Sequence, residues 1–239
     1  MNYLIKLKNL VLDILFPPIC LSCEQNLLEN EKADDLCDKC LSKITIHTTL
    51  FCSICKNRLP ENKKICHKNN AYLLGAITDY NYEIKNIIHY LKYKKWQRLS
   101  SVIKKLLNQY LDKLNLKNKT KNYIIIPIPL HKNRLKERGF NQSEIISKII
   151  SEKLNLNIKN NILTRLKETK PQAELKNWEE RKENLKNSFS INNSEEIKNK
   201  NIILIDDVYT SGSTINEAVK SLRGAGAKKI ITFVVAKVN

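Results

Sequence analysis

The 239 residues, 42% of them hydrophobic, are enough for one sizeable α/β domain with a small appended module. The formal net charge of +18 fits a surface that binds phosphate, nucleic acid or acidic lipid. The alternative is that the charge reflects the codon usage of an AT-rich genome, because Lys and Asn are abundant beside 5 Gly and 1 Met. In that case the basic residues simply lie on solvated faces of the protein. The sequence excludes a membrane-spanning helix, because it has no apolar run of about 18 residues.

The chain begins MNYLIKLKNLVLDILFPPIC, which is only superficially like a signal peptide. Asp13 interrupts the apolar stretch and no small-residue cleavage site follows. Apolar residues recur at helical spacing as far as Pro17 and Pro18, which predicts a short amphipathic helix that ends there. We expect this helix to pack on its own domain, although it could touch a membrane surface, and we expect a cytoplasmic protein.

All seven cysteines lie before residue 67. Two CxxC pairs are separated by 13 residues, a spacing typical of a tetrahedral four-thiolate zinc site: Cys20, Cys23, Cys37 and Cys40. Disulfides are the alternative, but a Lys-rich chain without a secretion signal favours a reduced compartment. A closed four-thiolate shell leaves no open coordination position, so this zinc would serve folding rather than catalysis.

A third pair, Cys52 and Cys55, is followed by Cys66 and His67. These residues could form a second zinc site, but both neighbours, Cys66 and His67, would have to reach one metal. A degraded site, or a pairing that interleaves the three CxxC units, is an equal alternative. The sequence therefore leaves open whether the chain holds one zinc ion or two.

After the cysteines, a strand is predicted near residues 72–78 and a helix from Glu83 onward. Basic and aromatic residues are interleaved near the end of this helical stretch: Lys92, Lys94, Lys95, Trp96 and Arg98. Such residues could hold single-stranded nucleic acid by stacking and charge. The periodicity favours the alternative, an amphipathic helix whose aromatics pack inward and whose lysines face water.

The rest of the chain alternates between strands and helices. Strands are predicted at residues 123–126, 161–163, 188–191, 201–205 and 229–238, and helices at 142–154, 174–185 and 214–222. This order indicates an α/β fold with a parallel sheet and right-handed crossovers. We expect a cysteine-rich module at residues 1–70 and an α/β domain at 71–239, in which 71–122 lead in and 123–239 form the core sheet.

The apolar run 202–205 ends in two adjacent acids, Asp206 and Asp207. They fall at the carboxyl end of a strand, where open α/β sheets bind ligands, and neighbouring carboxylates repel unless they meet hydroxyls or a cation. Small polar residues follow and lead into a helix: Thr210, Ser211, Gly212, Ser213 and Thr214. Their hydroxyls and backbone N–H groups would cradle a phosphate, so the segment predicts a sugar-phosphate site.

Two alternatives fit the acidic segment less well. A P-loop NTPase needs GxxxxGK[ST], which the chain lacks. A plain strand-to-helix turn with a Ser or Thr cap would account for Ser213 or Thr214 but would leave the paired acids unexplained.

The segment ILIDDVYTSGST resembles the phosphoribosyl pyrophosphate (PRPP) fingerprint of type I phosphoribosyltransferases. IPIPLHKNRLKERGFNQ (126–142), TRLKETKPQAELKNWEERKENLKNSF (164–189) and the cysteine-rich start before NIIHYLKYKKW are similar to the ComF family, double zinc ribbon proteins linked to natural DNA uptake. The chain departs from the family where a second full cysteine pair is expected and only Cys66 stands. The resemblance implies a type I phosphoribosyltransferase-like domain with an N-terminal zinc ribbon.

By this resemblance, Asp206 and Asp207 bind the ribose hydroxyls and Thr210 to Thr214 bind the 5′-phosphate. Candidates for pyrophosphate and for a mobile loop over PRPP are His131, Arg134, Arg138, Lys167, Lys170 and Gln172. Magnesium would accompany PRPP, and transfer would displace pyrophosphate at the anomeric carbon. Three interpretations stay open: a transferase with an unknown acceptor, a single-stranded DNA-binding competence factor that also meets other DNA-uptake proteins, and a PRPP sensor without turnover. The oligomeric state, a dimer included, is also open.

Overall fold

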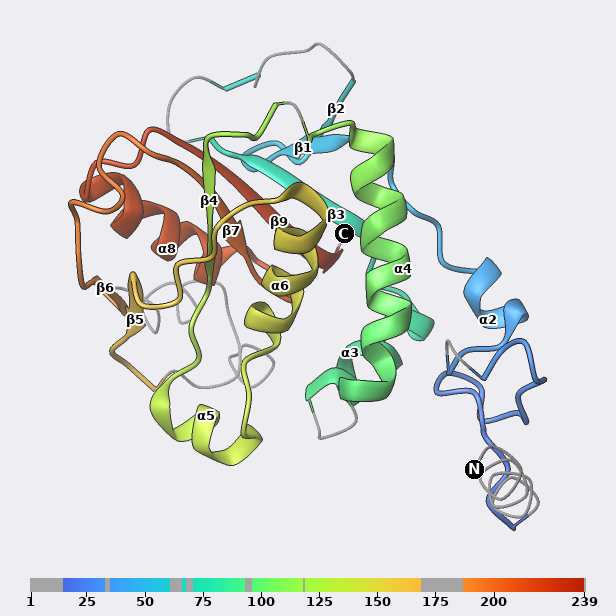
Figure 1. Cartoon of the computed structure of the whole chain (residues 1–239). Coiled ribbons are helices and arrows are strands. Elements are labelled where there is room, and N and C mark those ends of the chain that lie inside the picture. Colours follow the sequence, from blue (N-terminus) through green and yellow to red (C-terminus); the bar gives the residue numbers. More distant parts are fainter. Residues whose placement is uncertain are drawn as a thin grey trace. The chain divides into compact units, whose positions relative to one another are not determined.

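The computed structural model describes residues 15–32, 35–60, 66–67, 71–92, 96–117, 119–168 and 187–238, with 96–100 as backbone only (Figure 1). The chain forms two compact units, one of residues 1–45 with 81–103 and the other of 46–80 with 104–239. The single boundary expected at residue 70 stays a prediction. The predicted N-terminal helix before residue 15 and the predicted helix at 174–185 lie outside the described residues.

The larger unit is built on a seven-stranded sheet with the order β2-β1-β3-β9-β7-β4, in which β8 also pairs with β9. The strands are β1 Leu50–Cys52, β2 Arg58–Leu59, β3 Leu73–Asp79, β4 Tyr123–Pro127, β7 Asn201–Ile205, β8 Val208–Tyr209 and β9 Lys229–Lys237. β3, β9, β7 and β4 run parallel, whereas β1 and β2 are antiparallel additions at one edge. The predicted α/β fold with a mainly parallel sheet is confirmed.

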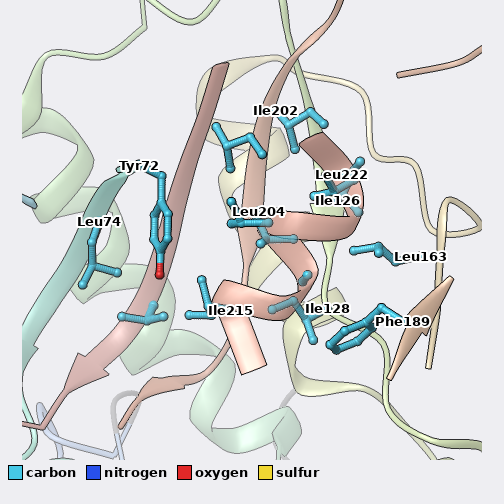
Figure 2. Close-up of a cluster of buried hydrophobic side chains, with 14 of the residues drawn as sticks. Tyr72, Leu74, Ile126, Ile128, Leu163, Phe189, Ile202, Leu204, Ile215 and Leu222 are labelled. Carbon is cyan, nitrogen blue, oxygen red and sulfur yellow. The ribbon is translucent and has the colours of Figure 1, made fainter. Parts of the chain in front are cut away.

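Helices cover the sheet because its central strands are apolar on both faces. Ile202 and Leu204 of β7 belong to a core cluster with the buried residues of α8 (Ser213–Gly224), which Figure 2 shows packed around them. Their neighbours Ile203 and Ile205 are also fully buried and point to the other face. There α6 (Gln142–Leu154) lies against β4 and β7. The helices predicted at 142–154 and 214–222 are therefore confirmed, and they hold β7 between them.

Two of the predicted strands do not join this sheet. β5 (Leu163–Arg165) and β6 (Phe189–Ile191) pair antiparallel with each other in a separate two-stranded sheet. Both are three residues long and carry a polar residue at the centre, Thr164 or Ser190. That pattern suits a sheet with one covered face, whereas a strand inside a parallel sheet must be apolar on both faces.

The remaining helices are α2 (Asp38–Ser42), α3 (Tyr82–Lys92), α4 (Trp96–Leu114) and α5 (Lys132–Arg138). In the smaller unit, α3 buries one apolar face made of Ile84, Ile87, Ile88 and Leu91, which confirms the predicted amphipathic helix. In the larger unit, Tyr110 of α4 makes an edge-on contact with Phe233 of β9, with ring centroids 6.2 Å apart. None of the helices in the described ranges has the length and hydropathy that crossing a bilayer requires.

Candidate functional site

The acidic pair lies at the carboxyl end of β7. The Asp206 N–H donates to the carbonyl of Phe233, and the Asp207 carbonyl accepts from the N–H of Val235, so both backbones are fixed by β9. Both aspartates are half-buried. The Asp206 Oδ1 atom accepts hydrogen bonds from the Asp207 N–H at 2.9 Å and from the Ser143 hydroxyl at 3.4 Å. The first turn of α6 thereby lies against the first aspartate.

The loop after the acids turns on Gly212. This glycine is the N-cap of α8, has a φ of 78° in the left-handed region, and contributes no side-chain cap to the helix. A Cβ atom there would stand 2.4 Å from the Tyr209 hydroxyl oxygen. The Ser211 and Ser213 hydroxyls are 2.8 Å apart, and the Ser213 N–H donates to Ser211 Oγ at 3.3 Å. The loop thus gathers hydroxyls and backbone N–H groups at a helix start, which is a favourable place for an anion.

The segment after β4 reaches the same edge of the sheet, because the Ile128 N–H continues the ladder to the Ile205 carbonyl. Residues 132–138 form the helix α5, which the sequence pattern did not predict. His131 is buried at its N-cap, where Nδ1 accepts from the Asn133 N–H at 3.4 Å, and Gly139 ends it with a φ of 79°. Of the candidate arginines, Arg134 is half-buried and Arg138 donates to Gln142 Oε1 at 3.4 Å.

Arg165 on β5 also belongs to this edge; it begins the polar stretch for which the resemblance implies a loop over PRPP, but it was not itself a site candidate. Burial lowers the pKa of its guanidinium, the Asp206 charge raises it, and the Arg134 charge lowers it again, so these three groups lie within electrostatic range of one another. A pocket of about 360 Å³ separates β5 from α5, and Arg165, His131 and Lys132 are among its lining residues. The pocket is the right size for a small anion between cations.

Of the three candidates for the loop over PRPP, the structure describes only Lys167. Lys167 is exposed directly after β5, and Glu168 Oε2 lies 3.7 Å from His131 Nδ1. Lys170 and Gln172 lie outside the described residues.

The nucleic-acid candidates are also placed only in part. Lys92 is half-buried at the end of α3. Lys94 and Lys95 lie outside the described residues, and Trp96 and Arg98 are described only as backbone of α4.

The first four cysteines come together in the smaller unit. Their sulfur atoms all lie within 4.8 Å of one another, with 3.7 Å between those of Cys23 and Cys37. Two thiolates on one tetrahedral zinc with bonds of about 2.3 Å stand about 3.8 Å apart, so the spacing fits. Burial raises the pKa of Cys20, but N–H groups of Cys23, Cys37 and Ser22 outweigh it and leave the pKa at about 7, which favours the thiolate a metal needs.

The second cluster, in the larger unit, has four donors rather than three. Cys52, Cys55, Cys66 and His67 each place one donor atom within 4.8 Å of the others. His67 Nδ1 is 3.5 Å from the Cys52 sulfur and 3.3 Å from the Cys66 sulfur, so adjacent residues do reach one point. A three-cysteine, one-histidine set is a common shell for structural zinc. The structure thus brings His67 to the position for which the sequence showed no second cysteine.

Two family models match the chain: a phosphoribosyl transferase domain over residues 89–239 and a double zinc ribbon domain over residues 11–69. The fold, the acidic pair and the loop therefore define a phosphoribosyl transferase domain, carried by a chain with two cysteine clusters. Together with the similarity to named competence proteins, these matches show that the chain belongs to the ComF family.

Among the relatives, competence protein F of Haemophilus influenzae is 40% identical over 114 residues, which span 47% of this chain and 49% of that protein. The DNA utilization protein YhgH of Escherichia coli K12 is 29% identical over 82% of this chain and 81% of its own length. Competence protein ComFC of Bacillus subtilis is 25% identical, over 87% and 79%. The match thus spans about half of the first relative and about four fifths of the others.

Proposed function

We propose that the chain binds PRPP at the carboxyl edge of its sheet and acts in natural competence in the cytoplasm. Asp206 and Asp207 would accept hydrogen bonds from the ribose hydroxyls, and the loop from Thr210 to Thr214 would bind the 5′-phosphate. The observation that carries this proposal is the glycine turn at residue 212: it starts α8 without a side-chain cap, five residues after two carboxylates at a strand end.

The pyrophosphate of PRPP would lie toward α5 and β5. There the pKa of Arg165 is lowered, first by burial and in smaller part by the Arg134 charge, so the two guanidinium groups repel each other. An anion between them would relieve their repulsion, and guanidinium groups suit bidentate phosphate contacts. Magnesium, when bound with PRPP, would neutralise the pyrophosphate and the nearby carboxylates.

If the protein is also a transferase, the acidic pair would have a second role. Displacement of pyrophosphate leaves positive charge on the sugar, and a carboxylate at the ribose stabilises that charge by proximity. The acceptor is not identified by any side chain of the site. Release of pyrophosphate in a screen of nucleobases and single-stranded DNA would separate a transferase from a PRPP sensor.

The test of PRPP binding is a titration calorimetry experiment with magnesium and PRPP. The variant Asp206→Asn with Asp207→Asn should lose about a hundred-fold or more in affinity, since two charged hydrogen-bond acceptors become neutral ones that accept more weakly. Asp112→Asn with Glu195→Gln makes the same change in charge at two exposed residues outside the acidic pair and the loop, and it should bind as the wild type does. Equal affinity in all three proteins would refute the proposal.

The names of the relatives support a second candidate, the handling of single-stranded DNA, because they refer to competence and DNA utilization. In that case the basic stretch from Lys92 to Arg98 would contribute. Charge reversal at Lys92, Lys94 and Lys95 should then abolish a salt-sensitive mobility shift with single-stranded DNA while PRPP binding stays unchanged. A shift that survives the reversal would remove this stretch from the proposal.

A further inference from the structure

A second pocket, of about 710 Å³, adjoins the turn before α8, from which Tyr209 and Ser211 line it. One wall is the turn between Cys52 and Cys55 together with the next residue, Lys56. A second wall is α8, which contributes Lys220 and Arg223. Neither aspartate of the acidic pair is among the lining residues. All of these walls belong to the larger unit, so the pocket is a feature of one compact body.

The charge of this pocket is positive. Among the residues that the structure describes, three that line the pocket are cationic and none of the lining residues carries a carboxylate. Lys220 is 3.7 Å from Glu217, which is outside the lining, and an ion pair of an exposed lysine at this distance is weak. Three cations from two different walls therefore face the same space, and among the described lining residues no carboxylate balances them.

Two of the three cations are held in position. Arg223 donates from Nη2 to the Ala71 carbonyl at 2.6 Å, which fixes the guanidinium at the start of β3. The Lys56 ammonium lies 5.3 Å from the centre of the Tyr209 ring, a cation–π distance. A pocket whose cations are already positioned binds an anion with less loss of side-chain freedom.

Tyr72 and Tyr209 lie beneath the pocket and are almost completely covered. Both are only 2% exposed, and the Tyr72 hydroxyl donates to Asn216 Oδ1 at 2.8 Å. Figure 2 shows Tyr72 at the end of the core cluster that also contains α8. Burial raises the pKa of both phenols, so neither adds a negative charge to the pocket at neutral pH. The apolar side chains of Ile54 and Val219 also line the pocket, which thus combines positioned positive charge with an apolar wall.

We propose that this pocket binds a small phosphorylated molecule with a planar body, such as a nucleoside monophosphate. The phosphate would lie between Lys56, Lys220 and Arg223, and the planar part would contact the apolar wall. The volume is in the range of small-molecule sites, whereas a nucleic acid strand needs an extended groove. The pocket borders the proposed phosphate loop at Ser211 but uses a different set of charged residues, so it does not depend on PRPP binding.

The test uses the full, zinc-loaded chain without PRPP and titrates AMP by calorimetry at physiological ionic strength. Lys56→Glu with Lys220→Glu should weaken AMP binding by about a hundred-fold, or about ten-fold for each charged contact. Both lysines are exposed, so the fold should persist, which circular dichroism will show. Lys198→Glu with Lys228→Glu changes the net charge equally at two exposed residues outside the pocket, and it should bind AMP within about two-fold of the wild type.

Further titrations distinguish this pocket from the PRPP site and from a nucleic acid surface. AMP carries the ribose hydroxyls and the 5′-phosphate that the proposed PRPP site would bind, so the lysine variants and their control are also titrated in the Asp206→Asn with Asp207→Asn background. There AMP should still bind, the loss with Lys56→Glu and Lys220→Glu should remain about a hundred-fold, and adenosine should bind more weakly than AMP. The proposal is overturned if AMP and inorganic phosphate do not bind, or if both lysine variants lose affinity equally. It is also overturned if AMP affinity falls only in the aspartate variant. The same holds if a thymidine oligonucleotide binds in a way that needs Lys56 and Lys220 while AMP does not bind.

Discussion

At the scale of single residues, the proposed phosphate loop depends most directly on Gly212. Two independent constraints act there: a φ of 78°, which L side chains rarely adopt, and the Tyr209 hydroxyl 2.4 Å from where a Cβ would stand. The glycine could be recognised from the sequence as a turn residue before a helix. The close approach of Tyr209 could not, because it depends on how β8 pairs with β9.

Replacing Gly212 with Ala should therefore destabilise the protein and weaken PRPP binding together. The strained φ costs about 1 to 2 kcal/mol and the overlap with Tyr209 a similar amount, so urea unfolding should show a loss of about 2 to 4 kcal/mol. Gly224→Ala is the matched control in the same helix, where an added Cβ meets nothing within 4 Å, and its stability should change by less than about 1 kcal/mol. A Gly212 variant as stable as that control would contradict the strain argument.

The sequence could not show which distant residues approach the acidic pair. The positions of Ser143 and Arg165 near Asp206 depend on where α6 and β5 lie in the folded chain. The acidic pair and its loop are contiguous, so a local pattern was enough to predict them. Residues that approach the acidic pair from distant parts of the chain form no local sequence pattern.

At the scale of elements, long apolar strands and periodic helices were predictable, and short polar elements were not. The ranges predicted for β7 and α6, 201–205 and 142–154, are the observed bounds. α5 was missed because its single large apolar residue, Leu135, is exposed, so the helix has no apolar stripe. β1 and β2 were missed because two or three residues carry too little alternation, and only pairing with β3 makes them strands.

The second cysteine cluster can be tested by measuring how many zinc ions the chain binds. Since all four donors already lie together, the purified chain should hold about two zinc ions, one for each cluster. His67→Ala should leave about one, because only the four-cysteine site keeps a full shell. His89→Ala removes an exposed histidine of α3 and should leave both. Metal analysis that finds one zinc in the wild type and no change in the His67 variant would show that this cluster binds no zinc.

At the scale of the whole molecule, the chain passes between its two compact units at residues 45–46, 80–81 and 103–104. No composition change in the sequence marks these points, because they are defined by contacts between distant segments. His47 and Asp79 stand beside the first two crossings. The backbone N–H of His47 donates to the Ile77 carbonyl at 2.7 Å. The ring atom Nε2 of His47 is 3.2 Å from Asp79 Oδ1, and Lys237 Nζ is 2.7 Å from the same carboxylate oxygen.

This group makes stability depend on pH. Burial lowers the pKa of His47 from its ordinary value near 6.5 by more than the Asp79 charge raises it, while Arg58 and Lys237 lower it further. Burial would raise the pKa of Asp79, but Lys237 and His47 leave it below its ordinary value near 3.8. In both cases the unfolded chain binds a proton more readily than the folded chain. Acid therefore favours unfolding.

The free energy of unfolding should be constant near pH 8 and should fall as the pH drops below about 6.5, when His47 is protonated in the unfolded chain first. A second fall should follow below about pH 3.8, from Asp79. Urea titrations between pH 8 and 5 would measure the first. His47→Gln should remove that part of the slope. His89→Gln replaces an exposed histidine outside this group and should not remove it. The zinc ligands are intact in both variants. Stability that rises on acidification in the wild type, or a slope that persists in the His47 variant, would show that another group controls it.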